Sequence, residues 1–189
     1  MTINKKLIGF TLFLVGITVL AKFYLGPQPD WSGFSPVIAI ALFSGMIIKE
    51  KNMSFLMPLL ALFISDLVIQ FLYKQGLFDY AGFFPGQWKY YVMLLASTLI
   101  GWLLKGRNAV SLLAGAFAAP TVFFLLSNFT VWALGDGVTY TRDTTGLLNC
   151  LAAGIPFYLR SLAATILLLP VIIVSYNYIM KQRTSILLA

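Results

Sequence analysis

Apolar stretches of bilayer-spanning length recur along the whole chain, and they constrain its fold more than any other feature. A transmembrane helix needs about 20 mainly apolar residues to cross a hydrocarbon core about 30 Å thick. Only 10% of the 189 residues are charged, against about 25% in a soluble domain. The sequence therefore predicts an all-α polytopic membrane protein with six transmembrane helices, in one integral membrane domain over residues 1–189. The predicted spans are 7–25, 36–48, 54–73, 90–104, 109–134 and 161–179.

The basic residues predict the orientation of the bundle. Cytoplasmic loops of membrane proteins carry an excess of Lys and Arg. Both termini are therefore expected on the cytoplasmic side, in a bacterial cytoplasmic (inner) membrane. The basic residues form no continuous face that would follow nucleic-acid phosphates, so no nucleic-acid partner is expected. Eight of the 13 Lys and Arg flank spans on one predicted side: Lys5, Lys6, Lys49, Lys51, Lys105, Arg107, Lys181 and Arg183.

The first apolar stretch allows two readings. Two lysines followed by an apolar run up to Leu20 resemble the start of a signal peptide, with Val19 and Ala21 at the cleavage site. The run continues through Leu25, however, and only Lys22 interrupts it. That length favours an uncleaved first helix.

Residues 144–159 do not fit the pattern of six spans. The segment is uncharged and contains two glycines and Pro156. As a seventh span it would place the basic C-terminal tail outside, and it is short for the hydrocarbon core. We therefore expect an extra interfacial or re-entrant helix on the outer side, capped by Asp143 or Thr144.

Two predicted spans are too short to cross the core alone. Residues 36–48 would make about 20 Å of helix and residues 90–104 about 22 Å. Both end at cytoplasmic lysines, so the missing length should lie on the outer side. Irregular backbone at membrane depth is tolerated where it is buried in protein or lines a wet cavity, which predicts an outward-facing vestibule. Snorkelling of Lys49 is the alternative explanation.

Asp66 is the only charged residue between Met53 and Tyr73. An ionisable residue inside a membrane is costly and by default indicates a functional site with a partner. Gln70 follows on the same helix face, and Asn128 lies at a similar height on the fifth predicted helix. The three side chains could converge on one outward pocket. Alternatively, Asp66 accepts hydrogen bonds from Asn128 or a hydroxyl group and only locks helices together.

Three further residues complete the candidate substrate-binding site. Ser35 precedes a proline, which is a helix-start signature that would either bind an anionic ligand group or simply cap the helix. Trp132 lies near the outer end of the fifth span. Arg142 and Arg160 are the outer arginines, and either would pair with a ligand anion, with Asp66 or with a surface aspartate.

No pattern in the chain indicates catalysis. The sequence has no histidine and one cysteine, and it has no phosphate-binding glycine loop or cluster of metal-ligand residues. A single carboxylate without a base partner or nucleophile gives no mechanism. We therefore expect no enzyme activity, no catalytic residues, no metal and no cofactor.

Several longer motifs stand out in the chain: FSPVIAIALFSG at 34–45, PLLALFISD at 58–66, SNFTVW at 127–132, YTR at 140–142, GLL at 146–148 and AGIPF at 153–157. They resemble motifs of a bacterial family of small, uncharacterised candidate transport proteins. That family is similar to the substrate-binding (S) components of energy-coupling-factor transporters. The resemblance implies six helices and a small vitamin- or metabolite-like solute bound on the outer face. It also implies a transmembrane coupling subunit and ATPases as partners.

The resemblance extends to most of the candidate site but names no substrate. The chain has Ala163, Ala164 and Thr165 where the family often places a polar or acidic residue, and Gly33 where it prefers asparagine. The positions that match the family are Ser35, Asp66, Asn128, Trp132 and Arg142.

Together these features predict a small-solute-binding subunit of a membrane transporter, with an outward-facing pocket. The predicted site comprises Ser35, Asp66, Gln70, Asn128, Trp132 and Arg142. The alternative is a non-transporting membrane scaffold or assembly subunit. Such a protein would use small-residue faces, for example Ala41-x-x-x-Gly45, to hold a complex.

Overall fold

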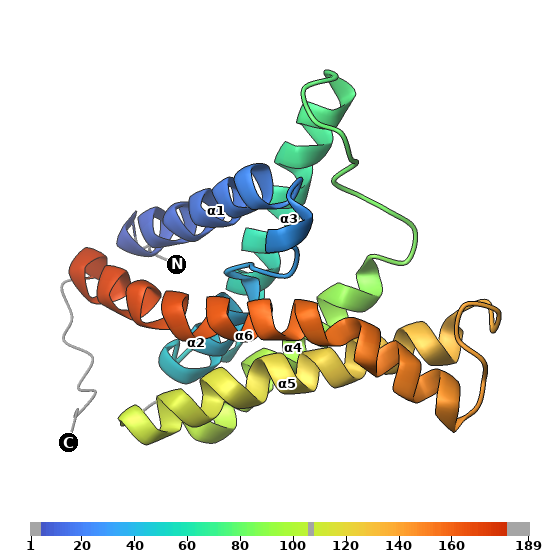
Figure 1. The fold of residues 1–189 in the computed structure, drawn as a ribbon. Helices are drawn as coiled ribbons and strands as arrows, with labels where there is room; N and C mark the ends of the chain where they lie inside the picture. The colour runs from blue at the N-terminus through green and yellow to red at the C-terminus, as the bar shows by residue number, and fades with distance from the viewer. Residues whose placement is uncertain (1–4, 106–107, 181–189) are drawn as a thin grey trace.

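The computed structural model describes residues 5–105 and 108–180, and the regular elements in these ranges are all helices (Figure 1). Among the described helices, α1, α3, α5 and α6 are long and apolar enough to cross a membrane, whereas α2 and α4 are shorter apolar helices. The all-helical, membrane-type architecture is confirmed. The elements are α1 (Lys5–Leu25), the 3-10 turn η1 (Pro29–Trp31), α2 (Val37–Ile47), α3 (Lys51–Lys74), α4 (Trp88–Leu104), α5 (Ala109–Leu134) and α6 (Thr144–Met180).

The six-span count and the cytoplasmic position of both termini stay predictions. The three long connections, 26–36, 75–87 and 135–143, lie away from the first turn of α1 and the last turn of α6 (Figure 1). We call the side with these connections the loop end. It corresponds to the predicted outer side. The basic tail from Lys181 and the basic residue Arg107 lie outside the described residues.

The expected separate helix at 144–159 is wrong, because α6 runs through this segment without a break. Pro156 and Pro170 both lie inside α6. Each proline removes one backbone hydrogen bond, but neither ends the helix here, and α6 packs extensively along α5. The 37 residues of α6 correspond to about 55 Å, well beyond the thickness of the hydrocarbon core.

Asp143 caps the start of α6, and it is one of the two residues, with Thr144, expected in that role. Its Oδ1 atom accepts a hydrogen bond of 2.7 Å from the backbone N–H of Gly146 and one of 2.8 Å from the hydroxyl of Thr141. The bond from the Gly146 N–H has the larger effect and the bond from the Thr141 hydroxyl the smaller. Together they hold the pKa of the Asp143 carboxyl below its usual value. The cap satisfies a backbone donor that the first turn of the helix leaves free.

Helix α2 forms the centre of the bundle and turns no face to the membrane. Nine consecutive residues, Ile38 to Met46, are buried. The helix packs most extensively against α4 and also contacts α3, α5 and α6. Its 11 residues span about 16 Å, which confirms that this predicted helix is short. The irregular segment 26–36, including η1, precedes it on the loop end.

Helices α2 and α4 approach so closely that their backbones touch at two glycines. A Cβ atom built on Gly45 would collide with the carbonyl group of Thr98, and one on Gly101 would collide with the carbonyl oxygen of Leu42. The small-residue motif ending at Gly45 therefore serves packing inside the bundle. Near this crossing, the buried hydroxyls of Ser44, Ser97 and Thr98 have no hydrogen-bond partner among the described residues. Close packing rather than hydrogen bonding holds this interface together.

The variant Gly45→Ala should lower the free energy of unfolding by about 1–3 kcal/mol, because a methyl group forces the touching backbones apart. Gly16→Ala is the matched control, since a Cβ atom there meets nothing within 4 Å. The control should be neutral or slightly stabilising, by about 0.5–1 kcal/mol, because alanine favours helix. Unfolding curves in mixed detergent micelles measure both variants. Equal stability of the two variants would contradict the tight crossing.

The predicted orientation can be tested by cysteine labelling in intact cells, in a Cys150→Ser background. Val138 in the connection 135–143 is 84% exposed, and Glu50 before α3 is also exposed. Val138→Cys should react with a membrane-impermeant maleimide in intact cells. Glu50→Cys should react only after permeabilisation, because the basic residues place that end inside. The reverse pattern would show the opposite orientation.

Candidate functional site

A cavity of about 580 Å³ lies in the half of the bundle next to the loop end. Its volume falls within the range of about 300–1,000 Å³ typical of small-molecule sites. All six α-helices and two of the connections contribute side chains to its wall. The lining residues are Lys22, Gly33, Ser35, Val37, Ile38, Leu62, Tyr90, Leu94, Pro120, Phe123, Phe124, Ser127, Asn128, Val131, Tyr140, Cys150, Ala153, Gly154, Phe157, Tyr158 and Ser161.

The cavity wall is mainly apolar and aromatic, with a few polar groups. Within the part of the chain that the structure describes, Lys22 is the one charged residue in the lining. The aromatic residues in the wall are Tyr90, Phe123, Phe124, Tyr140, Phe157 and Tyr158. Apolar walls with a small number of placed polar groups are what binding sites for small organic molecules require.

Asn128 lies at the contact between α5 and α6. Its amide Nδ2 donates to the carbonyl of Phe124 at 2.9 Å, and its backbone carbonyl oxygen lies 3.4 Å from the Sγ atom of Cys150. A Cβ atom on Gly154 would meet the Asn128 amide group. Glycine at this position of α6 therefore allows the amide to reach the cavity wall. This half of the wall is held by packing between two helices.

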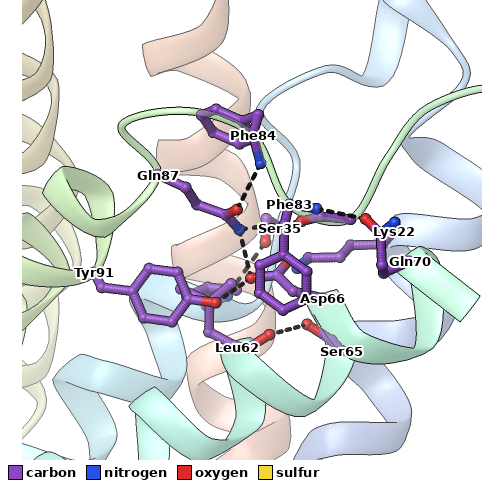
Figure 2. A network of polar contacts seen from close by, with 12 residues as sticks. Lys22, Ser35, Leu62, Ser65, Asp66, Gln70, Phe83, Phe84, Gln87 and Tyr91 are labelled. Carbon is purple, nitrogen blue, oxygen red and sulfur yellow. Dashed lines mark hydrogen bonds and ion pairs between the residues drawn. The ribbon is translucent and has the colours of Figure 1, made fainter.

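Asp66 lies on α3 behind the cavity, where three donors surround its carboxylate (Figure 2). Its Oδ1 atom forms an ion pair with the ammonium group of Lys22 from α1. Its Oδ2 atom accepts hydrogen bonds from the amide of Gln87, at 2.7 Å, and from the hydroxyl of Tyr91 on α4. The side chain of Asp66 is 6% exposed and that of Lys22 is 20% exposed. Asp66 thus meets the cavity through Lys22.

Gln87 connects this carboxylate to the loop 75–87. Its Nε2 atom also donates to the carbonyl of Gly82 at 3.2 Å, and its Oε1 atom accepts from the N–H of Phe84 at 3.1 Å. Gln70, one turn beyond Asp66, accepts from the N–H of Phe83 at 3.1 Å. The polar face of α3 therefore anchors the loop as well as the ion pair.

The structure does not bring Asp66, Gln70 and Asn128 together in the wall of one pocket. Asn128 and Ser35 line the cavity, whereas Gln70 turns to the backbone of the loop 75–87. The i, i+4 spacing on α3 does put Gln70 beside Asp66. Asp66, however, binds groups from α1, α4 and the loop 75–87, and Gln70 binds the loop. Of the two partners expected for Asp66, the hydroxyl group is found, because Tyr91 donates to the carboxylate, whereas Asn128 is not among its described partners.

The remaining predicted residues hold the connections at the loop end. Trp132 donates through Nε1 to the carbonyl of Thr141 at 2.9 Å, and Arg142 donates to the carbonyl of Gly135 at 3.2 Å. Neither residue lines the cavity. Arg160 donates to backbone carbonyls at 29 and 32 and fastens the segment 26–36 to α6. Neither arginine pairs with Asp66. Their predicted contact with a ligand anion stays a prediction.

Lys22 is the functional residue that sequence reasoning missed. In the sequence it interrupts the first apolar run as the lone cation there, just as Asp66 is the lone anion in α3. Opposite charges inside membrane segments commonly pair. Both also lie in the loop-end part of their helices, so a comparison of depths would have matched them. No sequence pattern indicates that Gln87 bonds to Asp66, because this contact depends on how the loop 75–87 folds.

Comparison with known proteins gives a family but no activity. Residues 2–187 match the model of a family described as "Family of unknown function (DUF6580)". No curated protein and no solved structure matches the chain. The family match carries no link to energy-coupling-factor S components, so that resemblance stays a hypothesis. Within the described ranges, no group of three His, Cys, Asp or Glu residues is placed to hold a metal ion.

Breaking the Lys22–Asp66 pair from either side should destabilise the bundle. Lys22→Met and Asp66→Asn should each lower the free energy of unfolding by about 2–3 kcal/mol, since each leaves one charge in a poorly solvated site. The double variant should lose less than the sum of the singles, with a coupling of about 1–2 kcal/mol. Unfolding in detergent of the wild type, the two single variants and the double variant measures this double-mutant cycle.

Lys74→Met is the control for loss of a lysine. Lys74 is exposed in the last turn of α3, so its replacement should change the stability by less than about 0.5 kcal/mol. Additive effects of the two single substitutions at the ion pair would show that the pair does not couple α1 to α3.

Proposed function

We propose that this chain, which belongs to the family of unknown function DUF6580, binds a small solute in its central cavity and serves as the substrate-binding subunit of a membrane transporter. The observation that carries the proposal is the cavity itself. All six helices of a membrane-type bundle line it, and its wall combines aromatic surface with one ammonium group. Convergence of every helix on one cavity is expected for a binding protein.

The position of the cavity supports uptake from the loop end. Below it, α2 fills the centre of the bundle and meets α4 at the glycine crossing. A solute reaching the cavity from the loop end therefore meets a closed bundle on the far side. Release to that side requires helices to move. A coupling subunit with ATPases, as the resemblance implies, would supply that movement.

A scaffold is the second candidate, and an open face on α1 favours it. A Cβ atom on Gly9 or Gly16 would meet nothing within 4 Å, so both glycines leave a shallow face on the outside of α1. Small residues on an outer face allow a helix of another protein to approach closely. The same face would also suit a coupling subunit. The internal glycine Gly45 does not separate the two candidates, because its replacement disturbs the bundle itself.

A ligand screen with a cavity-filling variant separates binding from scaffolding. Purified wild-type protein should be thermally stabilised by at least one member of a broad metabolite panel, since bound ligand stabilises the folded state by mass action. Ala153→Trp should abolish this shift, because Ala153 lines the cavity and an indole would occupy it. Ala152→Trp is the matched control, because its neighbour Ala152 is exposed and does not line the cavity. The control should keep the shift.

A panel that stabilises neither wild type nor control would contradict solute binding. A shift that survives Ala153→Trp unchanged would place the ligand outside this cavity. Capture of partner proteins that is lost in Gly16→Leu, from a protein that no member of the panel stabilises, would favour the scaffold.

A further inference from the structure

We propose that the Lys22–Asp66 pair makes the cavity select neutral ligands: compounds with an aromatic body and one hydrogen-bond-accepting carbonyl, such as aromatic amides, in preference to aromatic carboxylates. This inference rests on the proposed function and names the class of ligand that the same cavity takes. A lone lysine in a cavity would suggest the opposite preference. The position of Asp66 reverses it.

The first step concerns the hydrogen-bond donors of Lys22. A lysine ammonium carries three N–H donors. Its described bond goes to Oδ1 of Asp66, and the same side chain lines the cavity with 20% of its surface exposed. Donors thus remain for an acceptor inside the cavity. A carbonyl oxygen of a ligand is such an acceptor.

The second step concerns charge. Lys22 and Asp66 together carry no net charge, and the described lining adds no other ionic group. Arg160 is next to the lining residue Ser161, but its guanidinium donates to backbone carbonyls at 29 and 32. A ligand carboxylate would therefore bring an uncompensated negative charge close to Asp66, in surroundings of low dielectric constant. A neutral acceptor avoids both the repulsion and most of the desolvation cost.

The third step concerns the stability of the pair itself. Gln87 and Tyr91 satisfy the second oxygen of Asp66, so the carboxylate is held from two helices and a loop (Figure 2). A ligand cannot easily take the place of Asp66 beside Lys22, because it would have to displace a carboxylate with three donors. The ligand therefore binds beside the intact pair. The six aromatic rings in the wall favour a flat, ring-bearing body against them.

The test uses matched amides and acids: naphthylacetamide with naphthylacetate, and phenylbutyramide with phenylbutyrate. Binding is measured by calorimetry in lipid nanodiscs at a pH where both acids are ionised. Wild-type protein should bind each amide at least about tenfold more tightly than its acid. Asp66→Asn should reverse this order, because an unpaired ammonium then faces the cavity and attracts the carboxylate.

Two further variants keep the test decisive if Asp66→Asn folds poorly. The double variant Lys22→Met with Asp66→Asn carries no unpaired charge, and it should lose at least about fivefold in amide affinity with the ammonium donor gone. Ala152→Trp, outside the cavity, should keep the wild-type preference for amides.

Three results would overturn the inference: a preference of the wild type for acids, no binding of any amide by the wild type, and unchanged amide affinity in the double variant. In each case the metabolite panel decides the proposed function separately, because it does not depend on the charge of the ligand.

Discussion

The ion pair between Lys22 and Asp66 is the interaction on which the rest of the structure depends. A charge parted from its partner in this poorly solvated site would lose most of its stabilisation, so the pair holds α1 and α3 in one arrangement. Gln87 and Tyr91 extend that arrangement to α4 and to the loop before it. The position of one carboxylate thereby holds α1, α3, α4 and the loop 75–87 together (Figure 2). It also sets the position of Lys22, the charged residue of the cavity wall.

The sequence predicted the helices well where length and apolar character sufficed. It failed at α6, because glycines and prolines at 144–159 look like breaks, whereas packing along α5 keeps the helix continuous. The shortness of α2 was predictable, but its complete burial was not. An unbroken apolar run reads the same whether lipid or protein surrounds it. Which of the two applies depends on contacts with α4 and α6, far along the chain.

The candidate site was predicted in part for a similar reason. Ser35 and Asn128 are polar residues within apolar stretches, and both line the cavity. Tyr140, in the connection 135–143, also lines the cavity. Gln70, Trp132 and Arg142 instead bind backbone groups in the connections. Their residue types suit either ligand binding or hydrogen bonding to loop backbone, and only the path of the loops decides which of the two occurs.

The burial of α2 has a consequence for how the protein is made. A segment that enters the membrane during synthesis does so by partitioning into lipid, yet α2 in the finished protein touches other helices on all sides. The four helices that it contacts most, α3, α4, α5 and α6, are all synthesised after it. The centre of the bundle therefore forms last, although its residues come early in the chain. A nascent chain stopped before α4 lacks the helix against which α2 packs most extensively.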